Sequence, residues 1–197
     1  MKNIIVALVL IFFPLVMKAQ FAISLRDSKY VGVLYTYKEK YGVGLEHSVF
    51  SQEIETQYVR GYLNYTRSWT RFDLDSKLYY GTPYNHDYYN CGMMLSGRYK
   101  PFQSFEIMAS ANPHYDSYFD CEMCFEAGAL VKLSTDIGLY SLYSTIPEFR
   151  QKENRVKVGL HLNVMNLSVS PHLSIPTEGP VKSVRLLVNC SYVFSAR

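Results

Sequence analysis

An alternation of apolar and polar residues with a period of two is the feature of this sequence that most restricts its fold. It runs without a break from Tyr41 to Phe50 and returns in residues 156–164 and 184–194. Because successive side chains of a strand point to opposite faces, this period predicts β-strands rather than amphipathic helices. The segments are about ten residues long, which exceeds the usual five or six of soluble strands and matches the length that a tilted strand needs to cross a bilayer.

The same pattern, followed along the chain, predicts twelve strands joined by connections of two kinds. The strands are expected at 20–26, 29–38, 41–50, 57–68, 71–80, 90–99, 103–112, 124–133, 136–145, 155–164, 166–175 and 183–194. Short connections alternate with long ones, the long ones at 51–56, 81–89, 113–123, 146–154 and 176–182. This rhythm predicts an all-β, up-and-down antiparallel transmembrane barrel, because a Greek-key sandwich needs long connections between its sheets. Eight or ten strands remain alternatives, since the first strand is short and the register of 136–145 is irregular.

Residues 1–19 differ from the rest of the chain. Lys2 gives a basic start, and residues 4–17 form an apolar run shorter than the roughly 18 to 20 residues that span a bilayer as a helix. Such a run, followed by the small residue Ala19, is typical of a secretory signal peptide. We therefore expect residues 1–19 to be cleaved and residues 20–197 to form a single outer-membrane β-barrel domain.

Composition excludes several other classes of protein. Aromatic residues make up 15% and charged residues 19% of the chain, a balance that excludes a disordered protein. The net charge of +3 falls to +1 when Lys2 and Lys18 leave with the signal peptide, because 18 basic and 17 acidic residues remain. A nearly neutral mature chain gives no basis for nucleic acid as a partner.

The two faces of the predicted strands differ in chemistry. One face is apolar and almost uncharged, and the other carries the predicted lumen charges Glu46, Arg60, Arg98, Glu106, Glu126, Lys132, Lys157 and Arg185. A soluble barrel would turn its apolar face inward, so the alternation alone allows both arrangements. Tyr and Trp gather at strand ends, as in the aromatic girdles of membrane barrels, although ordinary β-propensity is the alternative explanation. With acids and bases in similar numbers, we expect ion pairs to fill the lumen.

In these features the chain resembles the small outer-membrane β-barrel proteins of Gram-negative bacteria, at the level of pattern and without a diagnostic motif. It shares their ten-residue alternating strands, their short turns opposite long loops, and a closing strand with Tyr192 and Phe194. The resemblance implies an outer-membrane location, periplasmic short turns and external loops, with lipid and the barrel-insertion machinery as partners. In that family the last strand usually ends on an aromatic residue at the C-terminus, whereas here Ser195, Ala196 and Arg197 follow Phe194.

The cysteines and the ligand-type residues of the loops allow further hypotheses. Four cysteines in an exported chain suggest a disulfide, and Cys91, Cys121 and Cys124 lie at the same rim, whereas Cys190 lies on the lipid face. A metal site is a weaker alternative, drawn from His86, Asp87, His114, Asp116, Asp120, Cys121 and Cys124. Their spacing matches no established zinc pattern, so we expect neither a metal nor another cofactor.

Catalysis has little support. Glu46-His47-Ser48 is a poor triad fragment, because in a strand His47 points away from its neighbours. Ser170, His172 and Ser174 share a face, but no nucleophile elbow accompanies them. We therefore predict no catalytic site.

The long loops offer a surface for recognition. Tyr84, His86, Tyr88, Tyr115 and Tyr118 suit contacts with an extracellular protein or glycan, although stacking among the loops would explain them equally well. The sequence favours a structural or surface-interaction barrel, which is not an enzyme. The first alternative is a narrow pore for small solutes, and the second is a lipid-modifying enzyme.

Overall fold

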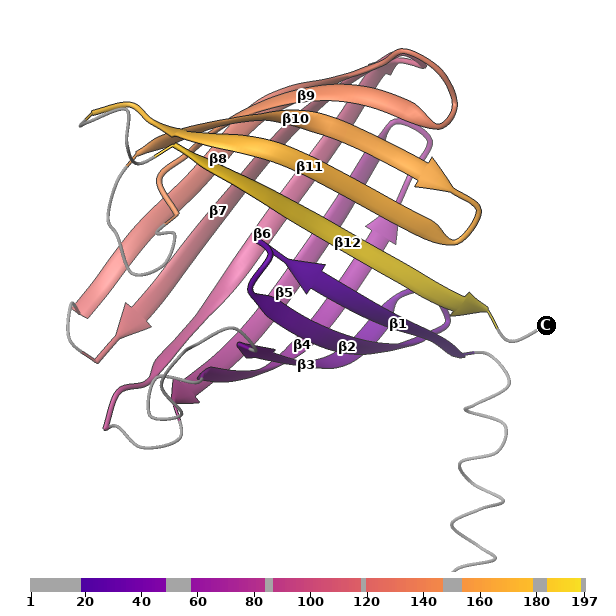
Figure 1. The fold of residues 1–197 in the computed structure, drawn as a ribbon. Coiled ribbons are helices and arrows are strands. Elements are labelled where there is room, and N and C mark those ends of the chain that lie inside the picture. Colours follow the sequence, from indigo (N-terminus) through magenta and orange to yellow (C-terminus); the bar gives the residue numbers. More distant parts are fainter. Residues whose placement is uncertain are drawn as a thin grey trace, which may run out of the picture.

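A closed barrel of twelve antiparallel strands makes up the described part of the chain, which is residues 19–48, 58–83, 87–117, 120–146, 154–178 and 184–195 of a computed structural model (Figure 1). Each strand pairs with its neighbours in sequence, and β1 closes the barrel against β12. The predicted up-and-down barrel is confirmed, and the count is twelve rather than eight or ten. No helix among the described residues is long and apolar enough to cross a membrane.

The strands lie close to their predicted positions. They are β1 (Ala19–Arg26), β2 (Tyr30–Tyr37), β3 (Tyr41–Ser48), β4 (Tyr58–Ser68), β5 (Phe72–Pro83), β6 (Asn90–Phe102), β7 (Phe105–Asp116), β8 (Asp120–Lys132), β9 (Ile137–Ser144), β10 (Arg155–Val164), β11 (Leu167–Pro176) and β12 (Arg185–Ser195).

The barrel has two unlike ends. The short-turn rim holds the connections β2–β3, β4–β5, β6–β7, β8–β9 and β10–β11, and the loop rim is the opposite end. Gln20 of β1 pairs with Ser195 of β12, so the first and last strands begin and end at the short-turn rim (Figure 1). At this rim the Lys40 N–H donates to the Tyr37 carbonyl at 3.1 Å, and Lys38 and Glu39 between them have φ of 52° and 56°. Two positive φ values define the type I′ turn, whose twist matches that of the flanking strands.

At the loop rim, the connection between β7 and β8 is shorter than predicted. The strand β7 runs through Pro113 to Asp116, and β8 already begins at Asp120. The long loop expected at 113–123 is therefore mostly strand. Pro113 cannot donate a ladder hydrogen bond, yet β7 continues past it for three residues.

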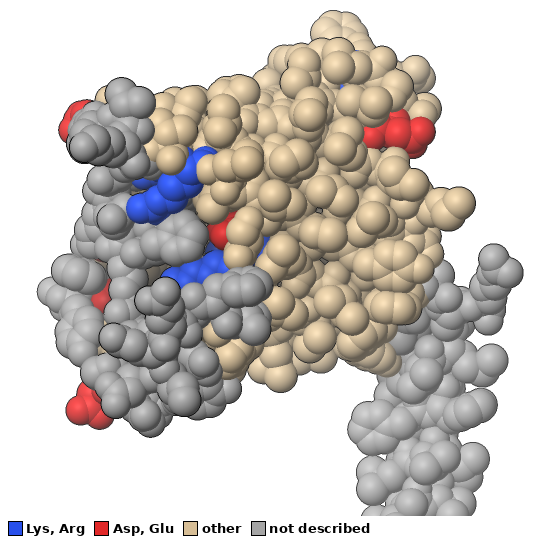
Figure 2. All heavy atoms as spheres, in the orientation of Figure 1, with Lys and Arg blue, Asp and Glu red and all other residues tan. Residues whose placement is uncertain are grey.

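The apolar face of the strands points outward. Leu45, Leu63 and Leu78 are 56%, 59% and 57% exposed on the outside of the barrel, whereas Glu106 and Arg155 are buried inside it. Figure 2 shows a wall whose middle is free of charged side chains, with Lys, Arg, Asp and Glu toward the two ends. This inside-out distribution excludes the soluble-barrel alternative, because a large exposed apolar surface needs an apolar surrounding.

Aromatic side chains mark both ends of this outer face. At the short-turn rim, ring centroids are 5.4 Å apart for Tyr41 and Tyr65 and 5.6 Å apart for Trp69 and Phe72. At the loop rim, outward-facing rings pack in pairs, as Tyr89 and Tyr115 do at 5.8 Å. Two residues of the expected girdle are exceptions, because Tyr79 and Tyr140 lie on inward positions of β5 and β9. The alternation itself predicts that both rings point inward, because each follows directly on a residue that points outward.

The expected disulfide is absent, and all four cysteines are free thiols. Cys91 and Cys121 both pair with Tyr115 of β7, one from each side, so a whole strand separates them. Two strand spacings amount to about 9.6 Å, which exceeds the roughly 7 Å that a disulfide tolerates between Cα atoms. Cys124 cannot replace either of them, since it points into the barrel and Cys121 points out of it.

Candidate functional site

The lumen of the barrel is the candidate functional site, since it gathers the polar face of every strand. The charges predicted for it lie at inward positions of β3, β4, β6, β7, β8, β10 and β12, namely Glu46, Arg60, Arg98, Glu106, Glu126, Lys132, Lys157 and Arg185. A tilted barrel of this size leaves space between its side chains, unlike an eight-stranded one, whose interior is just filled.

Glu46 holds a network in the half of the lumen nearer the loop rim. Its two carboxylate oxygens accept from Nη2 and Nε of Arg26 at 3.0 and 3.3 Å. Nη1 of Arg60 lies 3.8 Å from the same carboxylate, and the Arg60 guanidinium lies 4.7 Å from the ring centroid of Tyr79. The network joins side chains from three strands and so stabilises this part of the wall. The two guanidinium groups also neutralise the charge of the buried Glu46.

Glu106 holds a second network near the short-turn rim. Its carboxylate, which is almost fully buried, lies 2.6 Å from Nζ of Lys132 and 3.5 Å from Nε of Arg98. The two cations come from the strands on either side of β7. They are themselves 39% and 51% exposed to the lumen, so the site keeps a solvated positive edge.

A third group of polar contacts lies on β8 to β11. Glu126 accepts from Nζ of Lys157 at 3.0 Å and from the Ser144 hydroxyl at 2.7 Å. Beside it, the fully buried Arg155 donates to the hydroxyl and the carbonyl of Ser174 at 2.7 and 2.9 Å. Cross-strand pairs of this kind compensate the cost of taking charges from water.

A cavity of about 490 Å³ remains between these groups, toward the short-turn rim. Residues of β4 to β9 line it, and they include the hydroxyl of Ser110 as well as the apolar side chains of Met108 and Leu142. Its charged lining consists of Asp73, Asp75, Glu126 and Arg98. The ion pairs were expected to fill the lumen, but they leave a space that is large enough for many water molecules.

Aromatic side chains narrow the lumen above this cavity. The ring of Tyr62 lies over Gly44, its partner on β3, where any side chain would collide with it. Nζ of Lys77 lies 4.5 Å from the centroid of the same ring. A glycine opposite a large ring lets the ring lie flat against the wall, so Gly44 sets how far Tyr62 projects into the passage.

The predicted loop contacts have mixed outcomes. Tyr84, His86 and Tyr118 lie outside the described residues. Tyr88 is half-buried, and its hydroxyl donates to the Asp116 carboxylate at 2.5 Å. Burial and this hydrogen bond raise the pKa of Tyr88 above its ordinary value. Tyr115 lies in the strand β7 and packs on Tyr89 on the outer face, so it is a wall residue and not a loop contact.

The serine and histidine residues weighed as a catalytic set do not form one. Nδ1 of His161 lies 2.9 Å from the Ser170 hydroxyl, whereas Nδ1 of His172 lies 3.4 Å from the Ser170 carbonyl. Ser174 is bound to Arg155. His47 points to the outer face, as predicted, and its neighbours Glu46 and Ser48 are buried inside.

The charged side chains of the lumen that sequence reasoning missed include Asp73 of β5, Arg26 and Arg155. Arg26 ends β1 beside a turn, and Arg155 begins β10 after a long connection. Both continue the inward parity of their strands, Arg26 with Ser24 and Arg155 with Lys157. The alternation of inward and outward positions could therefore have placed both residues in the lumen, but the predicted strand ends were too uncertain to extend it that far.

The comparisons with known proteins bear on the fold. No protein-family model and no curated protein matches the chain. Among solved structures, the KdgM porin is similar, with a TM-score of 0.62, 12% identity, and coverage of 90% of this chain and 99% of that one. A structure of the KdgM porin in complex with disordered oligogalacturonate gives the same values. The NanC porin follows, with a TM-score of 0.48 and 9% identity over 89% of this chain. At 12% identity the likeness to the KdgM porin shows the fold alone, which is that of a small outer-membrane β-barrel.

Proposed function

We propose that this chain is a narrow channel for small hydrophilic solutes in the outer membrane of a Gram-negative bacterium. The observation that carries the proposal is the cavity of about 490 Å³, lined in part by charged and hydroxyl side chains, inside a closed barrel whose outer face is apolar. A purely structural barrel of this size would have to pack its interior with side chains, and here the paired charges leave a space between them. The fold shared with the KdgM porin supports the same role.

The charges of the lumen suit weak selectivity among solutes. Each carboxylate of the three networks lies against one or two cations, so acids and bases compensate one another in part along the passage. The cavity itself carries the carboxylates of Asp73, Asp75 and Glu126 against the guanidinium of Arg98. This lining disfavours an acidic saccharide such as the oligogalacturonate found with the KdgM porin, and it favours neutral or weakly cationic solutes.

A surface-interaction role, the leading expectation from sequence, has less support in the described residues. Tyr88 turns its hydroxyl to Asp116 and Tyr115 packs into the wall, so neither offers a free contact surface. The exported location and the removal of residues 1–19 form part of the channel proposal, because the strands need an outer membrane to cover their apolar face.

Planar-bilayer recording tests the channel directly. The refolded chain should give reproducible single-channel steps in potassium chloride. Ser110→Trp places an indole ring into the cavity and should lower the step size, whereas the neighbouring Ala111→Trp adds the same ring on the outer face and should leave it unchanged. An absence of steps in the unmodified protein, or equal steps in all three proteins, would count against the proposal.

A further inference from the structure

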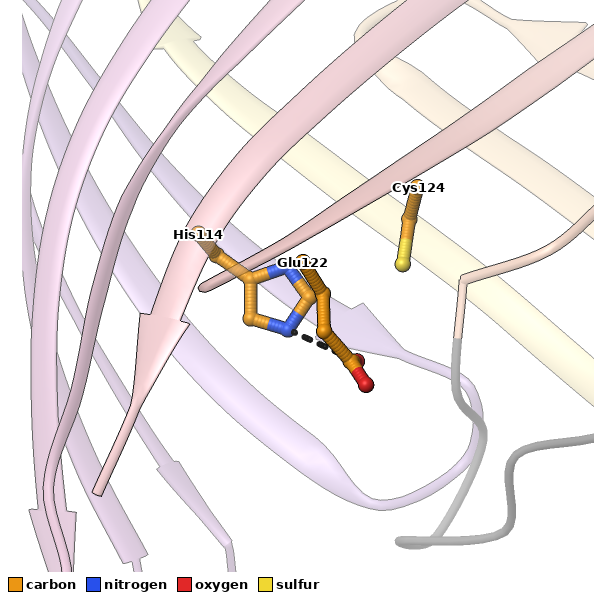
Figure 3. Close-up of side chains that lie close together, drawn as sticks. All are labelled: His114, Glu122 and Cys124. Atoms are coloured by element: carbon orange, nitrogen blue, oxygen red, sulfur yellow. Dashed lines mark ion pairs between the residues drawn. The ribbon is translucent and has the colours of Figure 1, made fainter. Parts of the chain in front are cut away.

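Three metal-ligand side chains meet inside the barrel near the loop rim. His114 of β7, Glu122 of β8 and Cys124 of β8 bring one ligand atom each to within 4.8 Å of the others (Figure 3). His114 and Glu122 are direct cross-strand partners, with Nε2 and Oε2 3.6 Å apart. Cys124 follows Glu122 by two residues and so faces the same side of the strand.

The cluster draws on only part of the metal-ligand set that the sequence suggested. Asp116 accepts a hydrogen bond from Tyr88, and Cys121 points to the outer face. Glu122 was absent from that set, although it is the residue that links His114 to Cys124 across the ladder. His86 and the Asp120 side chain lie outside the described residues.

The surroundings of His114 prepare it to bind a cation. Its Nδ1 lies 3.4 Å from the backbone carbonyl of Asn112, a group that can only accept a hydrogen bond. This contact favours the tautomer with the proton on Nδ1, which leaves the lone pair of Nε2 directed toward Glu122. A ligating histidine in a metal site is usually oriented by such a contact.

The donor set and its spacing fit zinc. In a tetrahedral site with bonds of about 2.0 to 2.3 Å, ligand atoms lie about 3.5 Å apart, so the present spacing closes with small side-chain movements. A thiolate, a carboxylate and a neutral imidazole together balance the charge of a divalent ion, and this balance suits a mostly buried position. Cys124 is 5% exposed and the Glu122 side chain 27%, so the fourth position opens toward the lumen.

We propose that His114, Glu122 and Cys124 form a zinc-binding site in the wall of the lumen. Binding releases the proton of the Cys124 thiol, and a water molecule or a solute donor completes the coordination at the open position. The proposal does not depend on the channel, since a barrel that fails to conduct could still bind the ion here.

Cobalt(II) substitution provides the test, because a cobalt–thiolate bond gives an absorption band that other ligands do not. The refolded full chain, free of chelators, should develop this band with Co²⁺ and lose it on addition of Zn²⁺. Cys124→Ser should abolish the band and weaken zinc binding by about 100-fold or more. The matched control Cys121→Ser, three residues away on the outer face, should keep both the band and the affinity.

Glu122→Gln separates this site from adventitious thiol binding, because it should weaken zinc binding while the cobalt–thiolate band returns at higher Co²⁺. Heat-dependent migration on gels verifies that each variant is a closed barrel. The proposal is overturned if the unmodified chain shows no band, if the band survives in Cys124→Ser, or if Glu122→Gln binds zinc as tightly as the unmodified chain.

Discussion

A charge placed on the outer face of β10 should destabilise the barrel to a degree that depends on its depth. Leu160 and Val164 both lie on that face and are 38% and 63% exposed. Leu160 is near the middle of the ten-residue strand, and Val164 is its last residue, next to the short-turn rim. Leu160→Arg and Val164→Arg therefore introduce the same side chain on the same surface at two heights.

The geometry of β10 sets the expected magnitudes. Ten residues rise about 33 Å along the strand, and a tilt of about 40° reduces this to roughly 25 Å across the membrane. Val164 then lies about 10 Å from the level of Leu160, close to the interface. An arginine at mid-bilayer costs about 2–4 kcal/mol, and near the interface about 0–1 kcal/mol. Leu160→Arg should accordingly reduce the free energy of unfolding by several times as much as Val164→Arg.

Equilibrium unfolding of the barrel in lipid vesicles measures this difference. Trp69 is the single tryptophan of the chain and lies at the short-turn rim, so its fluorescence reports the transition in all three proteins. If this face met water rather than lipid, arginine at position 160 and arginine at position 164 would lower the free energy of unfolding by nearly the same amount. Equal losses for the two variants, or a larger loss for Val164→Arg, would refute the assignment of this face to lipid.

Two further substitutions probe the interior. Glu106→Gln leaves Lys132 and Arg98 facing each other without their shared carboxylate. Because both cations are partly solvated, the free energy of unfolding should fall by about 1–3 kcal/mol, which is less than for a fully buried triad. An unchanged denaturant midpoint would show that the network does not stabilise the barrel. Ser174→Ala removes a hydrogen bond from the fully buried Arg155 and should lower the free energy of unfolding by about 1.5–3 kcal/mol in the same assay. The control Ser168→Ala, on the same face of β11 at the other rim, should lower it by less. The reverse order would contradict the assigned role of Ser174.

The direction of each side chain could be predicted from the sequence, because one residue of slippage would move a whole strand's apolar set from lipid to lumen. The alternation places Leu45 and Glu46 on opposite faces, and the membrane-barrel interpretation then turns Leu45 outward and Glu46 inward, as observed. A strand end carries a weaker signal. The connection predicted at 113–123 begins at Pro113, but β7 continues past this residue to Asp116. For this reason Tyr115 was assigned to a loop and Glu122 was not considered with His114.

The partners of the lumen charges could not be predicted, since they depend on the stagger of neighbouring strands. Glu106 meets Lys132 and Arg98 although its direct ladder partner on β8 is Leu130. Long side chains reach diagonal neighbours, and the sequence contains no measure of that reach. The cavity is a similar case, because it depends on how much of the interior the side chains of β4 to β9 occupy.

The passage of ions through this cavity is tested most directly by chemical modification of its lining during recording. With the four native cysteines replaced by serine, Ser110→Cys presents a single thiol to the cavity, and Ala111→Cys presents one to the outer face. A charged, membrane-impermeant thiol reagent should reduce the single-channel current of Ser110→Cys in discrete steps and leave that of Ala111→Cys unchanged. An undiminished current through Ser110→Cys, with labelling verified by mass, would contradict the account of this lumen as a channel.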